Sequence, residues 1–144
     1  MRTLGAAGTA LIRSFEKLEL EAYLDQGHIP TIGWGHTGPE VALGQTCTVE
    51  QAGEWFVQDT QKAVNAVNAS ICVLLSPNQF DAVAAFTFNV GITAEGHSTL
   101  CKKVNTQDMA GAAAEFMKWV YVKGVRSAGL ENRRAAERDL FLTP

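Results

Sequence analysis

The chain has 144 residues and a mass of 15.5 kDa, the size of one globular domain, with 47% hydrophobic and 19% charged residues. A net charge of −3 disfavours general nucleic-acid binding, and no apolar run of about 18 residues predicts a membrane span. The three cysteines, Cys47, Cys72 and Cys101, are widely spaced without a CxxC pair. We therefore expect buried free thiols rather than a disulfide framework or a zinc site.

The first predicted element is a helix over residues 8–17, because Leu11, Ile12 and Phe15 recur at a spacing that gives them one face. Between about residues 20 and 45, closely spaced glycines exclude a long helix. The β-branched and aromatic residues among these glycines favour short strands. The sequence therefore predicts a small β-hairpin or a three-stranded sheet after the first helix.

The next segment carries a helix start signal. Thr48 is followed three positions later by Gln51, which is the pattern of a capping box. In this motif the hydroxyl accepts from the Gln51 amide, and the Gln51 side chain reaches back to the start of the helix. We expect the helix to run to about Ala69.

A second capping box begins the most apolar helix of the chain. Ser76 and Gln79 have the required spacing, and Pro77 occupies the first helical position. The run FDAVAAFTFNV that follows is apolar almost all round, which is typical of a buried helix. The sequence therefore predicts a central helix that ends at Gly91.

The last third of the sequence is predicted to form three further helices. A short one lies near residues 98–104, and another is capped by Thr106 and runs to about Trp119. Residues 120–130, VYVKGVRSAGL, predict a loop, and residues 131–141, ENRRAAERDLF, predict the closing helix.

These elements predict an α+β fold that is mainly α. A small β lobe over about residues 20–45 adjoins a helical lobe formed by residues 48–144 and by the N-terminal helix 8–17, in one domain over residues 1–144.

Residues 1–96 carry an acidic excess and residues 97–144 a basic excess. The two parts could form opposite walls of one cleft, although scattered surface charge explains the same counts equally well. A ligand is expected between the lobes.

Several familiar site types are disfavoured. His28, His36 and His97 lack metal-ligand spacing, so we expect no bound metal, and His36 is predicted to be a hydrogen-bonded structural residue. Ser76 lies in a helix cap and not in a hydrolase elbow. No phosphate-binding or dinucleotide-binding fingerprint occurs, so no cofactor is expected.

Carboxylates near the first helix offer a different chemistry. Glu16 lies where that helix ends, Asp25 follows nine residues later, and Thr31 six residues after that. A partly buried acid that keeps its proton, an ionised carboxylate and a hydroxyl that holds a water can together hydrolyse a glycosidic bond. Glu19 and Glu21 suit a solvated position. On spacing alone, the alternative that none of these carboxylates is catalytic is the more frequent case.

The surrounding residues add a family resemblance. The run FEKLELEAYLDQGHIPTIGWGHT, residues 15–37, resembles the active-site signature of the phage-type, T4-like lysozymes, the endolysin muramidases of glycoside hydrolase family 24. In that family a Glu, then an Asp or Cys nine positions on, then a Thr six further form the triad. QFDAVAAFTFNVG, HSTLCKKVN and GLENRRAAERDLF resemble its later helices, so the likeness covers roughly residues 12–142.

The resemblance implies a two-lobed lysozyme fold and cleavage of the β-1,4 bond between N-acetylmuramic acid and N-acetylglucosamine in peptidoglycan, for host lysis. Carried over by position, Glu16 is the general acid, Asp25 is the carboxylate that activates water, and Thr31 helps to place that water. In many relatives a Gly follows the catalytic Glu, whereas Lys17 follows it here.

The resemblance also implies supporting residues. Arg133, the first of the paired arginines, matches an Arg that approaches the catalytic Glu from the C-terminal helix. Sugar contacts are implied near Thr37, Phe88, Thr99 and Glu115. The family often has a longer apolar side chain at the first of these positions and an amide at the last.

The expected partner is the glycan strand of peptidoglycan, with neither nucleic acid nor stable membrane association. Relatives with Cys in place of Asp in the triad carry a signal-anchor segment. Asp25 and the lack of a convincing anchor favour a monomer made in the host cytoplasm, released by a holin, and active on the wall in the periplasm.

Two rival functions remain open. A lytic transglycosylase also uses a catalytic Glu but lacks a second carboxylate, and Asp25 argues against it. A non-catalytic peptidoglycan-binding domain would keep the cleft without turnover, and an intact triad argues against that.

Overall fold

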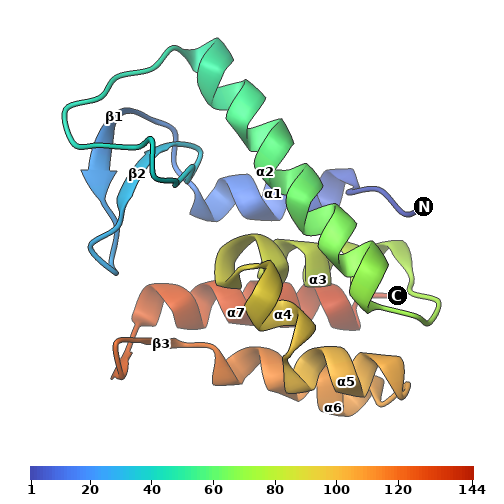
Figure 1. Cartoon of the computed structure of the whole chain (residues 1–144). Coiled ribbons are helices and arrows are strands. Elements are labelled where there is room, and N and C mark those ends of the chain that lie inside the picture. Colours follow the sequence, from blue (N-terminus) through green and yellow to red (C-terminus); the bar gives the residue numbers. More distant parts are fainter.

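The computed structural model describes all 144 residues, as a small β lobe and a larger helical lobe (Figure 1). In the β lobe, β1 (Glu19–Leu24) pairs antiparallel with β2 (Pro30–Gly33). A single bridge between Glu21 and Thr46 joins the following loop to this sheet. The predicted hairpin is therefore confirmed, and the third strand is reduced to one bridge.

Helices form the rest of the molecule. In chain order they are α1 (Ala6–Phe15), α2 (Val49–Ser70), α3 (Pro77–Val90), α4 (Ile92–Gly96), α5 (Thr99–Asn105), α6 (Met109–Glu115), the 3-10 turn η1 (Phe116–Lys118) and α7 (Ala128–Leu142). Figure 1 shows α2 slanting from the β lobe down to the helical lobe. None of the helices is both long and apolar enough to cross a membrane.

The two capping boxes begin helices where the sequence predicts them. The Ser76 hydroxyl accepts from Gln79 N, and the Gln79 side chain accepts from Ser76 N, so this box is complete. At α2 the Thr48 hydroxyl accepts from Gln51 N at 3.1 Å, which is one half of the box. Both helices therefore begin with one of their free amides satisfied.

The core forms around α3, as its apolar sequence predicts. Every residue from Phe80 to Thr87 is buried, and α3 packs against α1, α2 and α7. A cluster of 15 buried hydrophobic residues surrounds it, and a separate cluster of Ala22, Ile32 and Val41 fills the β lobe. The β lobe thus has its own small core, attached to the main one through α1 and α2.

A buried carboxylate holds α1 on α3. Asp81 accepts hydrogen bonds from Gly5 N at 2.8 Å and from Gly8 N at 2.9 Å. These are free amides of the first turn of α1, where the helix dipole favours negative charge. Because Glu16 follows directly after the other end of α1, this contact helps to fix its position.

One predicted cap is wrong. We expected Thr106 to begin the helix after α5, but Asp108 caps α6 and accepts from Gly111 N at 2.9 Å. Thr106 ends α5 instead, where its hydroxyl donates to carbonyls of the preceding turn. Gln107, with φ of 62°, makes the sharp turn between the two helices.

The predicted loop at residues 120–130 contains a hairpin. β3 (Tyr121–Val122) pairs with β4 (Val125–Arg126) across the two-residue turn Lys123–Gly124. Both turn residues have positive φ, 49° and 79°, as the turn types that suit two-residue hairpins require. The closing helix begins three residues earlier than predicted, at Ala128.

The cysteines only partly match their prediction. All three are free, as expected, but burial differs among them: Cys101 is buried, Cys47 is half-buried and Cys72 is exposed. Cys72 follows the end of α2, so it lies on a surface connection and not on a core-facing helix.

Glu95 lies on α4, a short helix that the sequence did not predict, and its side chain has no exposed surface. Ser70 Oγ lies 2.9 and 3.0 Å from its two carboxyl oxygens. Burial raises the pKa of Glu95 above its ordinary value of 4.5. The folded protein therefore holds this proton more tightly than the unfolded chain does.

A pH dependence of stability follows. The contribution of Glu95 is fully present below about pH 4.5 and is lost as the pH rises through its folded pKa. Glu95→Gln keeps an acceptor for Ser70 without a charge, so we expect its melting temperature at pH 7 to exceed that of the parent by a few degrees. Thermal unfolding at several pH values checks this, and an identical pH dependence in both proteins would contradict it.

Candidate active site

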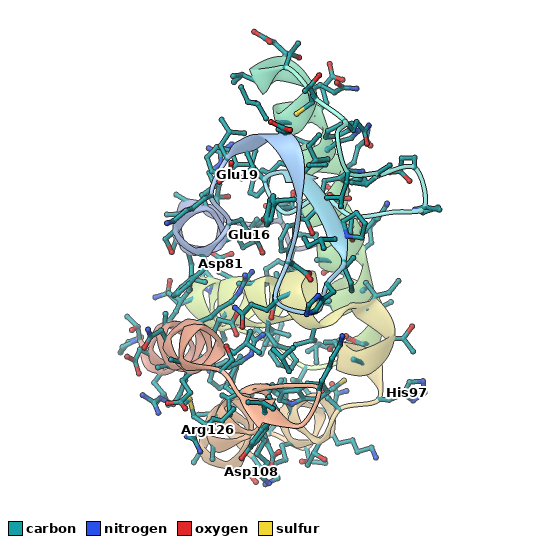
Figure 2. The ribbon with its side chains drawn as sticks, turned by 90° about the vertical axis from the view of Figure 1, so that its left-hand side faces the viewer. Glu16, Glu19, Asp81, His97, Asp108 and Arg126 are labelled. Atoms are coloured by element: carbon teal, nitrogen blue, oxygen red, sulfur yellow. The ribbon has the colours of Figure 1, made fainter.

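A cleft of about 790 Å³ lies between the two lobes. Its walls come from the β1–β2 hairpin, the ends of α1 and α3, the β3 strand and the start of α7. The three predicted catalytic residues, Glu16, Asp25 and Thr31, all line it. Figure 2 shows Glu16 between the hairpin and the helical lobe, whereas Glu19 lies further from the helical lobe, on β1. The structure thus brings together three residues spread over 16 positions of sequence.

Glu16 directly follows α1 and is held by a side chain of α7. Its amide donates to Ile12 O at 2.9 Å, after which the backbone becomes extended and the chain turns into β1. The Glu16 side chain is 15% exposed, and Arg133 Nη1 of α7 donates to its Oε1 at 2.8 Å. Arg133 therefore lies where the sequence predicts it, beside the carboxyl of Glu16.

A buried charge network lies behind Arg133. Glu137, with no exposed surface, hydrogen-bonds to Arg134 and lies 3.7 Å from Arg133 Nε. Arg134 also donates to the carbonyl of Trp119 at 3.0 Å and to the side chain of Asn89. These contacts fix one face of α7 against the cleft, which limits the positions open to Arg133.

Asp25 begins a tight turn between the strands. Its Oδ1 accepts from Gly27 N at 2.8 Å and from Ile29 N at 2.9 Å, and its own amide donates to Ile29 O at 3.0 Å. An Asp that bonds to the backbone two residues on is a common turn former. Because Oδ1 already accepts two bonds, Oδ2 is the oxygen left for a further partner.

Thr31 lies on β2, opposite Tyr23 of β1, and is 3% exposed. Its hydroxyl donates to Ile29 O at 2.8 Å. The single hydroxyl proton is therefore used, and the oxygen remains available only as an acceptor. Ile29 bonds to Asp25 through its amide and to Thr31 through its carbonyl, so one residue positions both side chains.

Tyr23 is a cleft residue that the motif analysis did not single out. Burial raises the pKa of the Tyr23 phenol, and the carboxylates around it, those of Glu16, Glu19 and Asp25, raise it further. The hydroxyl therefore keeps its proton at neutral pH and can donate a hydrogen bond. The signal in the sequence was its position on β1, two residues before Asp25.

Gly35 is the second residue that sequence analysis missed. It has φ of 77°, and a Cβ built there would lie 2.3 Å from Glu16 Oε2. The left-handed conformation favours glycine, and a side chain there would have to displace the Glu16 carboxyl, which Arg133 holds. The second glycine of TIGWGHT thus lets the loop after β2 approach the carboxyl of Glu16.

This close approach predicts the effect of Gly35→Ala. We expect a loss of about 1–2 kcal/mol of stability from backbone strain, together with at least a tenfold loss of activity because Glu16 is displaced. Gly44→Ala is the matched control, since Gly44 has φ of 87° but a Cβ at that position would meet no atom within 4 Å. Denaturation and lysis rates should separate the two: equal activity loss in both would remove the Glu16 contact as the cause.

His36 occupies the hydrogen-bonded structural position that the sequence predicts. It is buried, with Nδ1 2.7 Å from Asp59 and Nε2 2.8 Å from Glu40. Its ring stacks on Trp55 with the centroids 4.7 Å apart. His36 therefore joins the loop after β2 to α2. No group of three His, Cys, Asp or Glu side chains is arranged to hold a metal ion.

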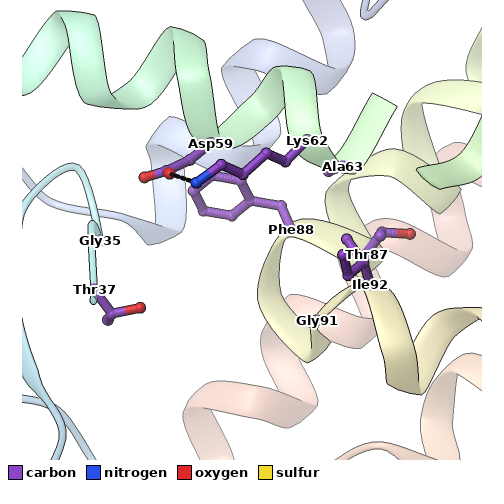
Figure 3. Close-up of a pocket in the computed structure, with 9 residues that line it drawn as sticks. All are labelled: Gly35, Thr37, Asp59, Lys62, Ala63, Thr87, Phe88, Gly91 and Ile92. Carbon is purple, nitrogen blue, oxygen red and sulfur yellow. Dashed lines mark ion pairs between the residues drawn. The ribbon is translucent and has the colours of Figure 1, made fainter. Parts of the chain in front are cut away.

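The predicted sugar-contact residues separate into two pairs. Thr37 and Phe88 line both the cleft and an adjoining hollow of about 250 Å³ (Figure 3). Asp59 and Lys62, 3.8 Å apart, form the α2 side of that hollow.

Thr99 and Glu115 lie outside the lining of both cavities. Thr99 is exposed at the start of α5. Glu115 is buried, and its hydrogen bonds to Lys118 and then Lys103 lower its pKa. Their contacts with sugar stay predictions.

Comparison with known proteins agrees with this geometry. The profile of the family described as phage lysozyme matches residues 13–137. The chain is 42% identical to the endolysin of Acyrthosiphon pisum secondary endosymbiont phage 1, over 93% of this chain and 94% of that protein.

Two solved structures are similar in fold. The endolysin from Escherichia coli O157:H7 phage FAHEc1 has a TM-score of 0.86 at 42% identity, covering 98% of this chain and 94% of that chain. The muramidase domain of SpmX from Asticaccaulis excentricus has a TM-score of 0.88 at 36% identity, covering 100% of both. The matches extend over both lobes and the cleft between them, and this chain belongs to the phage lysozyme family of peptidoglycan-cleaving glycoside hydrolases.

Proposed function

We propose that the chain is an endolysin muramidase that hydrolyses the β-1,4 bond between N-acetylmuramic acid and N-acetylglucosamine, with inversion at the anomeric carbon. The observation that carries this proposal is the convergence of Glu16, Asp25 and Thr31 on one cleft. A carboxyl pair with a water-holding hydroxyl is the set of groups that inverting glycoside hydrolysis needs.

Glu16 is the proposed general acid. Arg133 binds Oε1, so the proton that is transferred to the leaving sugar oxygen belongs on Oε2. Loss of that proton leaves a carboxylate next to a guanidinium, which stabilises the charge formed in the reaction. Tyr23 keeps its own proton in the same cleft and can donate to substrate without competing as a base.

Asp25 and Thr31 are proposed to hold the attacking water. Asp25 Oδ2 and the Thr31 hydroxyl oxygen each act as acceptors, because their other bonding positions are used within the hairpin. A water that donates one proton to each of them directs its lone pair away from both. Asp25 then accepts the proton that the water loses as it attacks.

Thr37 and Phe88 are proposed to contact sugar on the side of the cleft next to the hollow. The Phe88 ring packs on Phe56 with the centroids 6.0 Å apart, so it offers a fixed apolar surface to a sugar face. Thr99 and Glu115 line neither cavity, so their sugar contacts rest on the family resemblance alone.

Arg133→Ala tests the proposed support of Glu16. Removing the guanidinium takes away the hydrogen bond that fixes Glu16 Oε1, so we expect the lysis rate to fall at least tenfold. Arg138→Ala, on the same helix but only half-buried and paired with Asp139, is the matched control and should keep near-normal activity. If Arg133→Ala also kept near-normal activity, Arg133 would have no part in positioning Glu16.

Loss of turbidity of chloroform-treated Gram-negative cells tests the proposed activity. Lysis excludes a non-catalytic wall-binding domain, and no lysis by folded protein would overturn the proposal. Analysis of the products then separates the two enzyme classes, because a hydrolase leaves reducing ends and a lytic transglycosylase leaves 1,6-anhydro ends. We expect reducing ends, since Asp25 and Thr31 are present to hold water.

We infer further that the protein is a monomer made in the host cytoplasm and released to the wall by a holin. An aspartate at position 25 fits this mode of release. Expression without a holin should leave cells intact until chloroform is added. Lysis during expression alone would contradict holin-dependent release.

A further inference from the structure

Two cysteines that are far apart in sequence meet at the end of α2. Cys72 Sγ lies 3.9 Å from the carbonyl oxygen of Ser70, and Cys101 Sγ of α5 lies 3.8 Å from the same oxygen. The two sulfur atoms are therefore within about 8 Å of each other. Cys47, in contrast, packs against the separate core of the β lobe.

Asn105 holds the two cysteines together. Its Nδ2 donates to Ser70 O at 2.8 Å and lies 3.7 Å from Cys101 Sγ, while its Oδ1 accepts from Cys72 N at 2.8 Å. One side chain thus fixes the backbone of Cys72 beside the sulfur of Cys101. This arrangement keeps the start of the α2–α3 connection against α5.

The two thiols differ in access. Cys72 is exposed and lies on an irregular connection, whereas Cys101 is 4% exposed. Burial raises the pKa of the Cys101 thiol, and Glu95 nearby raises it further. An external oxidant therefore meets Cys72 first, and Cys101 is protected until Cys72 has reacted.

We propose that Cys72 and Cys101 form a dithiol that closes to an intramolecular disulfide when the protein meets a small-molecule disulfide such as oxidised glutathione. The Cys72 thiolate attacks the oxidant, forms a mixed disulfide and releases one thiol. The Cys101 sulfur then attacks Cys72 Sγ, and its proton passes to the departing thiolate, which leaves as the second thiol. The oxidant is reduced to two thiols, and the protein loses two hydrogen atoms.

Closure requires the Cys72 side chain to turn toward Cys101. A disulfide needs the Cβ atoms about 3.5–4.5 Å apart, and Cys72 can change its rotamer because it is exposed and not within a helix. The bond would join the α2–α3 connection to α5. Because neither cysteine lines the cleft, we expect a gain in stability and no change in the chemistry of catalysis.

The test is oxidation of the purified full chain with oxidised glutathione, followed by mass spectrometry, thiol titration in denaturant and thermal unfolding. The parent and the matched control Cys47→Ser should each lose two thiols, become about 2 Da lighter, and yield a linked Cys72–Cys101 peptide. Their melting temperatures should rise by about 5–10 °C on oxidation. Lysis rates should stay within twofold.

The single-cysteine variants separate the two steps. Cys101→Ser should stop at the mixed disulfide on Cys72, and Cys72→Ser should not react at these two positions. A parent protein that kept all three thiols, or that stopped at a glutathione adduct, would overturn the proposal. Either result leaves the lysis activity, and hence the proposed enzyme function, as a separate question.

Discussion

Glu16→Gln is expected to abolish lysis while the protein stays folded. Glutamine has nearly the same shape, and its amide oxygen can still accept the hydrogen bond that Arg133 donates to Oε1. The amide cannot give a proton to the leaving sugar oxygen, however, and losing general acid catalysis lowers rates by about 10²–10⁴-fold or more. Lysis of chloroform-treated cells measures the effect, and circular dichroism with thermal unfolding checks the fold.

Glu19→Gln is the control for the register of the site. Glu19 is an exposed residue at the start of β1, three positions further along the chain, and it does not line the cleft. It should keep near-normal activity. If Glu19→Gln lost activity while Glu16→Gln kept it, the assignment of the general acid would be wrong.

The helices with chemical start signals were the most predictable part of the fold. The box at Ser76 and Gln79 is local, so its effect does not depend on what packs around it. The apolar run from Phe80 to Thr87 likewise predicted burial directly, since a helix that is apolar all round needs neighbours on every side.

Elements set by turns were less predictable. Lys123–Gly124 makes a two-residue hairpin turn although lysine rarely adopts positive φ, so this dipeptide carries a weaker signal than Asn-Gly. Thr106 and Asp108 are both acceptable helix caps, and the sequence did not determine which of them would begin α6. Glu95 was also hidden, because an acid in a five-residue helix looks like a surface residue until its packing is known.

The three candidate catalytic residues were predicted from spacing and family resemblance, whereas the residues that position them were not. The intervals between Glu16, Asp25 and Thr31 indicated the cleft residues, and the structure brings all three to one cavity. The contact of Gly35 with Glu16 depends on how the loop after β2 folds back, which no local pattern encodes. The same is true of Ile29, whose backbone amide and carbonyl, and not its side-chain type, bond to Asp25 and Thr31.

The stereochemical prediction follows from the bonds of Thr31. A retaining enzyme needs its second carboxylate close enough for a covalent sugar intermediate, with the carboxyl groups roughly 5–5.5 Å apart, whereas an inverting enzyme leaves roughly 6.5–9.5 Å for a water. The Thr31 hydroxyl donates to Ile29 O and can only accept from a further partner, and a water is such a donor. We therefore expect inversion, with the wider separation between Glu16 and Asp25.

Thr31→Val and Thr31→Ser test this geometry together. Valine has a similar shape but cannot accept from the water, so we expect activity to fall by about 10²-fold or more with only a modest loss of stability. Serine keeps the hydroxyl and should retain most of the activity, which shows that the hydroxyl and not the methyl group matters. Proton NMR of the first product from a defined β-linked glycan then decides the mechanism: the α anomer should form first, and an initial β anomer would show retention and exclude the water-holding role of Asp25 and Thr31.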